Sequence, residues 1–244
     1  MSNNILFIFE GQKTEKLISD SLFRYFLNEN TVVTCAYCTT IYKIHNEFLE
    51  DEYLDTFNLV KDLDANKEIL KDFKRTDFAQ IFMFFDYDGH ASNAGDHKLI
   101  NLLNFFDEET EKGKLYISYP MVEALKHVED FNTFHILAVA CKNFSVYKNT
   151  VNKMCLKELK HFNLYNENIW EKVISTHLYK MNQIVNNTYT FPTTIINQLT
   201  IFNKQLENHK TLNKTIAILS SFPVFLHDYY GNQELKHRLN EFPH

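Results

Sequence analysis

The sequence predicts an α/β protein, with a small central, mostly parallel sheet flanked by helices and a helical C-terminal region. Short apolar runs rich in Ile and Phe alternate with charged segments of helical spacing, which is typical of a parallel sheet covered by helices. Glycine (5) and proline (4) are scarce among 244 residues, which disfavours a turn-rich all-β fold. Hydrophobic residues make up 45% of the chain, enough for a core and too many for a disordered protein.

The first half of the chain is predicted to alternate strands and helices. Residues 5–9 are an uninterrupted apolar run, the pattern of a strand buried on both faces. Residues 14–28 carry apolar side chains at helical spacing, and residues 31–44 are β-branched and aromatic, which favours a strand. The elements expected next are helices over 46–74, a strand over 80–85, a helix over 96–108, a strand over 115–118 and a helix over 121–128.

From about residue 130 the pattern changes to helical spacing without further apolar strands. Helices are expected within 151–162, 170–187 and 193–209, with a loop near 186–192. We therefore predict an α/β domain over residues 1–130, to which the acids described next assign metal binding, and a helical region over residues 131–244 that serves as a cap or as a docking surface for a partner.

Acidic residues follow two of the predicted strands. Glu10 ends the first apolar run, and Asp86 and Asp88 end the run over 80–85. The carboxyl ends of parallel strands meet at one edge of a sheet, and residues two apart on an extended strand share a face. Clustered carboxylates favour Mg²⁺ or Mn²⁺. Read singly, Glu10 could instead cap the following helix, and residues 86–89 could form an ordinary polar turn.

These acids lie in two motifs, Glu-Gly-x-x-Thr-Glu at 10–15 and Asp-Tyr-Asp at 86–88. Together they resemble the TOPRIM fold of topoisomerases, primases and OLD-family nucleases. The first motif is most similar to that of OLD-family, RloB-like and PARIS-type anti-phage effectors. The resemblance covers residues 4–125, about half the chain. It implies a metal-dependent nuclease acting on DNA or RNA, with Glu10, Asp86 and Asp88 as catalytic residues and metal ligands.

The resemblance also implies supporting residues. Glu15 would serve a second ion, and Glu123 corresponds to an acid that follows a strand–proline segment in RloB-like relatives. OLD-like nucleases use a further lysine, for which Lys142 is the candidate and Lys148 an alternative. Each has a plainer interpretation, as a helix cap or an exposed surface residue.

The remaining features bound the cellular setting. No stretch of 18 apolar residues and no signal peptide occurs, which predicts a soluble, cytoplasmic protein without membrane contact. The four cysteines are expected to be free thiols, and His90 and His97, near the second motif, to be solvated loop residues. These cysteines are Cys35, Cys38, Cys141 and Cys155.

Three functions remain open at this point. A nuclease of anti-phage defence would need restraint by a partner, and because no P-loop motif is present any ATPase or sensor would be a separate subunit. The net charge of −6 opposes nucleic-acid binding by the whole surface. The same metal site could serve nucleotidyl transfer, as in primases, with Lys13 as one triphosphate-binding candidate. The third hypothesis is a non-catalytic interaction subunit; oligomeric state stays open.

Overall fold

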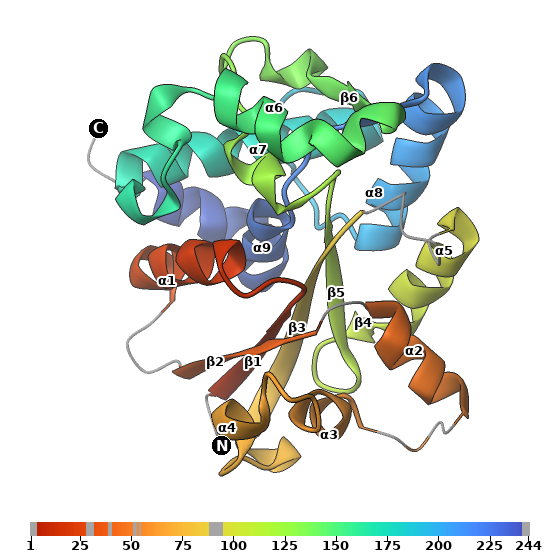
Figure 1. Ribbon diagram of the computed structural model, residues 1–244. Helices are drawn as coiled ribbons and strands as arrows, with labels where there is room; N and C mark the ends of the chain where they lie inside the picture. The colour runs from red at the N-terminus through yellow and green to blue at the C-terminus, as the bar shows by residue number, and fades with distance from the viewer. Residues whose placement is uncertain are drawn as a thin grey trace. The chain divides into compact units, whose positions relative to one another are not determined.

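The computed structural model describes residues 4–27, 32–38, 41–50, 53, 55–87 and 95–240. They form an α/β fold with a mostly parallel five-stranded sheet, flanking helices and a helical C-terminal region, so the predicted fold class is confirmed (Figure 1). The chain divides into two compact units, residues 1–85 with 93–116 and residues 86–92 with 117–244. The predicted division at residue 130 stays a prediction.

The first unit contains most of the five-stranded sheet, whose strand order is β2-β1-β3-β5-β4. Strand β1 pairs in parallel with β2 on one side and β3 on the other, and β4 is antiparallel to β5. Figure 1 shows α1 on one side of the sheet and α2 and α5 on the other. The elements are β1 Asn4–Phe9, α1 Thr14–Phe26, β2 Val32–Tyr37, α2 Ile41–Glu50, α3 Thr56–Lys61, α4 Lys67–Leu70, a 3-10 helix Arg75–Asp77, β3 Phe78–Asp86, α5 Asp96–Phe105, β4 Asp107–Glu108 and β5 Gly113–Ser118.

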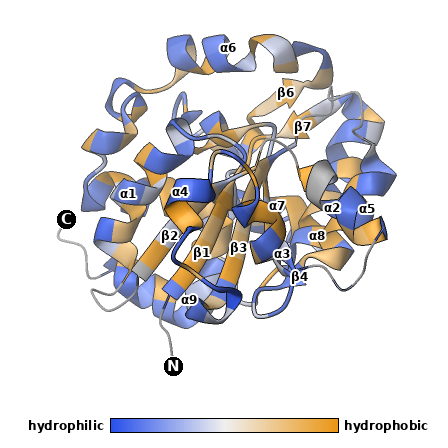
Figure 2. Ribbon diagram, turned by 60° about the horizontal axis from the view of Figure 1, so that its bottom comes forward, coloured by the Kyte–Doolittle hydropathy of each residue, from blue (hydrophilic) through white to orange (hydrophobic). Residues whose placement is uncertain are grey.

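Strand β1 forms the centre of this unit because both of its faces are covered. The Phe7 ring lies 5.1 Å from that of Phe23 on α1 and 5.8 Å from that of Phe82 on β3. Residues Ile5–Phe9 and Ile81–Phe85 are buried without interruption, and both strands are hydrophobic along their length (Figure 2). Burial on both faces explains why these strands read as continuous apolar runs.

The prediction of one strand over 31–44 is wrong in its second half. Strand β2 stops at Tyr37, and Ile41 begins the helix α2. The Asn66 side chain pairs with the backbone of the last residue of this edge strand: its Nδ2 donates to the Tyr37 carbonyl at 2.8 Å, and its Oδ1 accepts from the Tyr37 amide at 2.8 Å. A side chain 29 positions away thus satisfies backbone groups that no neighbouring strand pairs.

The second unit is mostly helical, as predicted, although it begins with the last residue of β3 and the end of β5. Its main elements are the 3-10 helices Val122–Lys126, Phe134–Ile136 and Cys141–Val146, β6 Ala138–Ala140, α6 Tyr147–Met154, α7 Glu167–Asn186, α8 Gln198–Gln205, a π-helix Leu206–Thr211, β7 Thr215–Ala217 and α9 Ser221–Asn240. Further 3-10 turns span Lys157–Leu159 and Phe162–Leu164. Strands β6 and β7 pair antiparallel as a small separate sheet, which the sequence did not predict.

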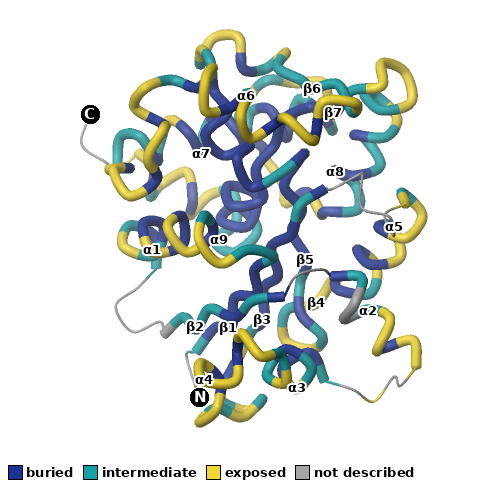
Figure 3. The backbone as a smooth tube through the Cα atoms, in the orientation of Figure 1, coloured by how far each residue is buried: buried dark blue, intermediate teal, exposed yellow. Residues whose placement is uncertain are grey.

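Helices α7 and α9 form the core of this second unit. They pack against each other, and much of both helices is buried (Figure 3). The Trp170 indole is fully buried on α7, with its ring centroid 5.2 Å from that of Tyr165. No helix in the described ranges is both long and apolar enough to cross a bilayer.

Candidate active site

The predicted acids stand at a topological switch point of the sheet. From β1 the chain runs through α1 to β2 on one side and later returns to β3 on the other side. In open α/β sheets ligands bind beyond the carboxyl ends of the strands at such a point. Phe9 pairs with Phe84, and the Glu10 amide donates to the Phe84 carbonyl at 3.2 Å. Glu10 therefore follows β1 at the edge where β3 ends in Asp86.

The turn after β1 is closed by a carboxylate. The Gly11 amide donates to Oε1 of Glu15 at 3.1 Å, and the Glu15 side chain is buried. A Cβ atom on Gly11 would lie 2.7 Å from the same oxygen, so this approach requires glycine. Glu15 thus holds the turn that precedes α1 and does not cap the helix, and its role toward a metal ion stays a prediction.

The segment after β3 is held by its aromatic residue. The Tyr87 amide donates to the Ser118 carbonyl at 2.9 Å, and its hydroxyl accepts from Nζ of Lys210 at 2.7 Å. The Tyr87 ring is buried against those of Tyr119 and Phe202. Asp88 and His90 lie outside the described residues. Lys210, on the π-helix, was missed by the sequence analysis, since it lies 123 positions from Tyr87 with no motif around it.

The acid predicted after β5 is paired with a lysine. Glu123 lies on the 3-10 helix Val122–Lys126, its carboxylate buried, with Nζ of Lys148 at 3.0 Å from Oε1. The Lys148 side chain is 65% exposed, so its ammonium remains accessible from solvent. Lys142 is exposed on the 3-10 helix Cys141–Val146, and no ion pair joins it to an acid in the ranges that the structure describes. Of the two candidate lysines, only Lys148 is thus placed beside a predicted site acid.

A buried tyrosine lies within the field of two predicted acids. Burial, followed by the negative charges of Glu123 and Asp86, raises the pKa of Tyr147 well above its usual value. The Tyr147 hydroxyl shares a 2.9 Å hydrogen bond with Nδ1 of His127, and Nε2 of this imidazole lies 3.3 Å from Oε1 of Glu129. Burial, and then the charge of Lys180, lowers the pKa of His127 to about 4. At neutral pH the tyrosine and the imidazole are therefore both uncharged, and with Nε2 donating to Glu129 the Nδ1 atom accepts from the Tyr147 hydroxyl.

Neither Tyr147 nor His127 is predicted as a site residue by the sequence. Thirteen tyrosines and eleven histidines are scattered through the chain, so residue type alone does not single out these two. Their only signal is proximity in sequence to Glu123 and Lys148. The exposed His97, in the first turn of α5, makes no hydrogen bond or ion pair with any described residue.

Within the described ranges, no group of three His, Cys, Asp or Glu side chains is arranged to hold a metal ion. Asp88, one of the three principal predicted ligands, falls outside those ranges. No protein-family model, curated protein or solved structure matches this chain.

Proposed function

We propose that the protein is a Mg²⁺- or Mn²⁺-dependent nuclease of TOPRIM type that cleaves phosphodiester bonds in DNA or RNA. The position of Glu10 and Asp86, after adjacent parallel strands at the switch point of the sheet, supports this function most directly. This is the edge at which α/β sheets bind their ligands. A purely structural role would not require acids at the ends of two neighbouring strands.

The donor set suits a hard divalent cation. Glu10 and Asp86 are both partly exposed, so their carboxylate oxygens can reach an ion, and Asp88 would add a third carboxylate. Glu15 and Glu123 already accept from Gly11 and Lys148, which suits support of the site better than direct ligation. A bound ion would polarise the scissile phosphate and lower the pKa of a coordinated water.

Lys148 is the cation that we assign to the phosphate. Its ammonium is held by the buried Glu123 carboxylate, yet most of the side chain is exposed. A positioned ammonium stabilises the negative charge that grows on phosphate oxygens during cleavage. Lys142, which is exposed, remains the second candidate for this role.

The net charge and the cysteines of the chain bear on the cellular role that we propose. A chain of net charge −6 gains little affinity for nucleic acid from its whole surface, so binding would depend on the metal ions and on local cations such as Lys148. No disulfide joins Cys35, Cys38, Cys141 and Cys155, which suits the reducing compartment that this proposal assumes. In this proposal the protein is an anti-phage effector whose cleavage is restrained by a separate ATPase or sensor subunit.

The test compares Asp86→Asn with a matched control, Asp107→Asn, which removes an exposed carboxylate on β4. With Mn²⁺, Asp86→Asn should cleave labelled DNA and RNA at least about 100-fold more slowly, which corresponds to about 2.7 kcal/mol of lost transition-state stabilisation. Asp107→Asn should cleave like the wild type. Both variants should keep the wild-type Tm without metal, since neither substitution changes side-chain volume.

Mn²⁺ binding can be measured even if a partner subunit controls cleavage, because it does not require the active state. Mn²⁺ should bind the wild type in a titration followed by electron paramagnetic resonance, and Asp86→Asn should weaken that binding. Equal Mn²⁺ affinity in the two proteins would reject the assignment. Incorporation of labelled nucleotide in place of cleavage would assign the same residues to nucleotidyl transfer.

A further inference from the structure

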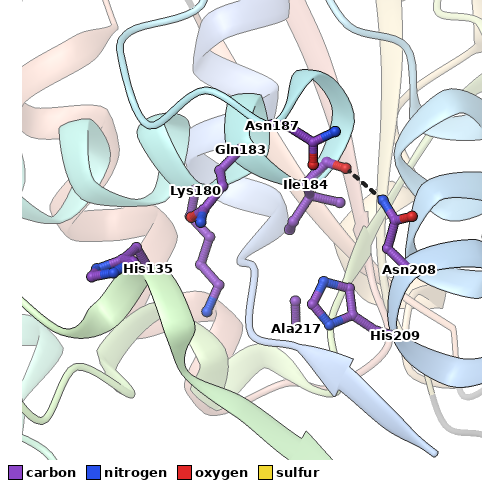
Figure 4. A pocket seen from close by; sticks show the side chains of 8 residues that line it. All are labelled: His135, Lys180, Gln183, Ile184, Asn187, Asn208, His209 and Ala217. Carbon is purple, nitrogen blue, oxygen red and sulfur yellow. Dashed lines mark hydrogen bonds between the residues drawn. The ribbon is translucent and has the colours of Figure 1, made fainter. Parts of the chain in front are cut away.

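The second unit contains a polar cavity of about 220 Å³ beside α7, partly open to solvent. At roughly 30 Å³ for each water, this is room for about seven water molecules or one small metabolite. Figure 4 shows Lys180 reaching into a space that has His135 on one side and His209 and Ala217 on the other. Six of its eight lining residues are polar: His135, Lys180, Gln183, Asn187, Asn208 and His209, with Ile184 and Ala217 completing the wall.

Lys180 brings a buried amine, which is a cation when protonated, to this cavity. Its side chain is only 1% exposed, and Nζ donates to the carbonyls of Phe134, at 2.9 Å, and Leu137. The ammonium also lies 4.4 Å from the centroid of the Phe134 ring. Carbonyls and a ring face stabilise the charged form, and two acceptors leave the third ammonium hydrogen for a ligand.

Nothing negative balances this charge within the described part of the chain. No carboxylate there forms an ion pair with Lys180, and burial lowers its pKa well below the usual value. Burial, and then the Lys180 charge, lowers the pKa of His209, and burial together with that charge lowers the pKa of His177 to about 3, so neither of these two imidazoles adds a second cation at neutral pH. A buried cation without an acid is costly, and an anion in the cavity would offset that cost.

Gln183 places a buried hydrogen-bond acceptor at the cavity, so a ligand that fits there should carry a hydrogen-bond donor. Its Oε1 atom is buried and accepts no hydrogen bond from any described residue. Leaving a buried acceptor unpaired costs about 1–3 kcal/mol, so a ligand with an O–H or N–H group would gain from this position. The nearby Asn208 amide donates instead to the Ile184 carbonyl at 3.2 Å, which holds the cavity wall in place (Figure 4).

We propose that this cavity binds a small phosphate ester that also carries a hydroxyl or N–H group. Its anionic oxygens would accept from Lys180, and its hydroxyl or N–H would donate to Gln183. The volume exceeds what a lone phosphate needs, so the ester's organic part would fill the remainder. None of the predicted site acids lines this cavity, and the proposal does not depend on nuclease activity.

The cavity wall includes a segment with unusual geometry. The π-helix Leu206–Thr211 supplies Asn208 and His209 to the cavity, and its next residue, Lys210, donates to the Tyr87 hydroxyl. Short π-helical segments are rare and often occur at functional sites. A ligand in the cavity would therefore contact the helical turn that also holds Tyr87.

The test uses inorganic phosphate, ribose 5-phosphate and sulfate as probes. Calorimetric titrations at pH 7 and constant ionic strength should show saturable one-to-one binding of phosphate and ribose 5-phosphate. Sulfate has the same charge as hydrogen phosphate but no O–H group, so it should bind at least about 10-fold more weakly, a difference of about 1.4 kcal/mol. This comparison requires only the wild-type protein.

Two substitutions locate the binding. Gln183→Glu places a negative charge in the cavity and should abolish binding of both phosphate probes, whereas Gln233→Glu, exposed on α9, should not. Lys180→Met should also abolish binding, whereas Lys172→Met, exposed on the same helix, should not. Equal binding of phosphate and sulfate, no saturable binding up to about 10 mM, or full binding by a folded Gln183→Glu variant would each overturn the proposal.

Discussion

Lys148 holds its ammonium 3.0 Å from the carboxylate of Glu123, a side chain that is only 5% exposed. Replacing Lys148 with Met should lower the free energy of unfolding by about 1–2 kcal/mol, because it leaves a buried carboxylate without its cation. The loss is smaller than for a fully buried pair, since Lys148 is 65% exposed and partly solvated. Urea denaturation at pH 7 measures it.

Lys142→Met is the matched control for that measurement. Lys142 is exposed, so its replacement should change stability by no more than about 0.5 kcal/mol. The two variants also separate the candidate lysines in cleavage assays. Slower cleavage by Lys142→Met than by Lys148→Met would contradict the choice of Lys148.

The turn after β1 predicts coupling between Gly11 and Glu15. Gly11→Ala would bring a Cβ atom within 2.7 Å of the Glu15 carboxylate and displace it, at a cost of about 1 kcal/mol for the lost hydrogen bond. In a Glu15→Ala background the same glycine substitution should cost much less, because the obstructing oxygen is gone. A double-mutant cycle of unfolding free energies tests this, and strictly additive effects would contradict it.

Acid should destabilise the protein below about pH 6.5. Burial lowers the pKa of His127 to about 4, of His177 to about 3 and of His227 to about 4. Between the ordinary histidine pKa of about 6.5 and these values, the unfolded chain binds protons that the native state does not. The free energy of unfolding should therefore fall as pH falls, by up to about 1.4 kcal/mol per pH unit for each histidine. Urea titrations at pH 7.5, 6.0 and 5.0 measure that slope.

Two of these histidines should respond differently to the same substitution. His177 accepts from the Ser220 amide at 3.2 Å and contacts the Leu125 carbonyl at 3.3 Å, so His177→Leu leaves both backbone groups unpaired and should cost about 2–4 kcal/mol. His227 buries an Nε2 atom that has no partner among the described residues. At pH 7.5 His227→Leu should therefore change stability by less than about 1 kcal/mol. Either variant should flatten the pH dependence, and an unchanged slope would contradict the assigned pKa shifts.

The sequence predicted elements well where burial is complete on both faces. Strands β1 and β3 are such elements. A continuous apolar run can be recognised in the sequence even when the strands and helices that pack against it are not known. Strand β6 had no such signal: Ala138–Ala140 are only partly buried, and they pair with residues 215–217, far along the chain. Short strands of this kind are specified by their partner rather than by their own composition.

For the candidate site, the sequence by itself determined that acids follow β1 and β3, because a carboxylate ending an apolar run is visible residue by residue. Only the tertiary structure decided that Glu15 accepts from the Gly11 amide, that Lys148 rather than Lys142 pairs with Glu123, and that Lys210 reaches Tyr87. The burial of the Lys180 side chain is likewise a tertiary fact. The physical reason is the separation in sequence of the residues involved. Apolar periodicity is a pattern among residues close in sequence, whereas a hydrogen bond or ion pair joins any two groups that the packed helices bring within about 3 Å.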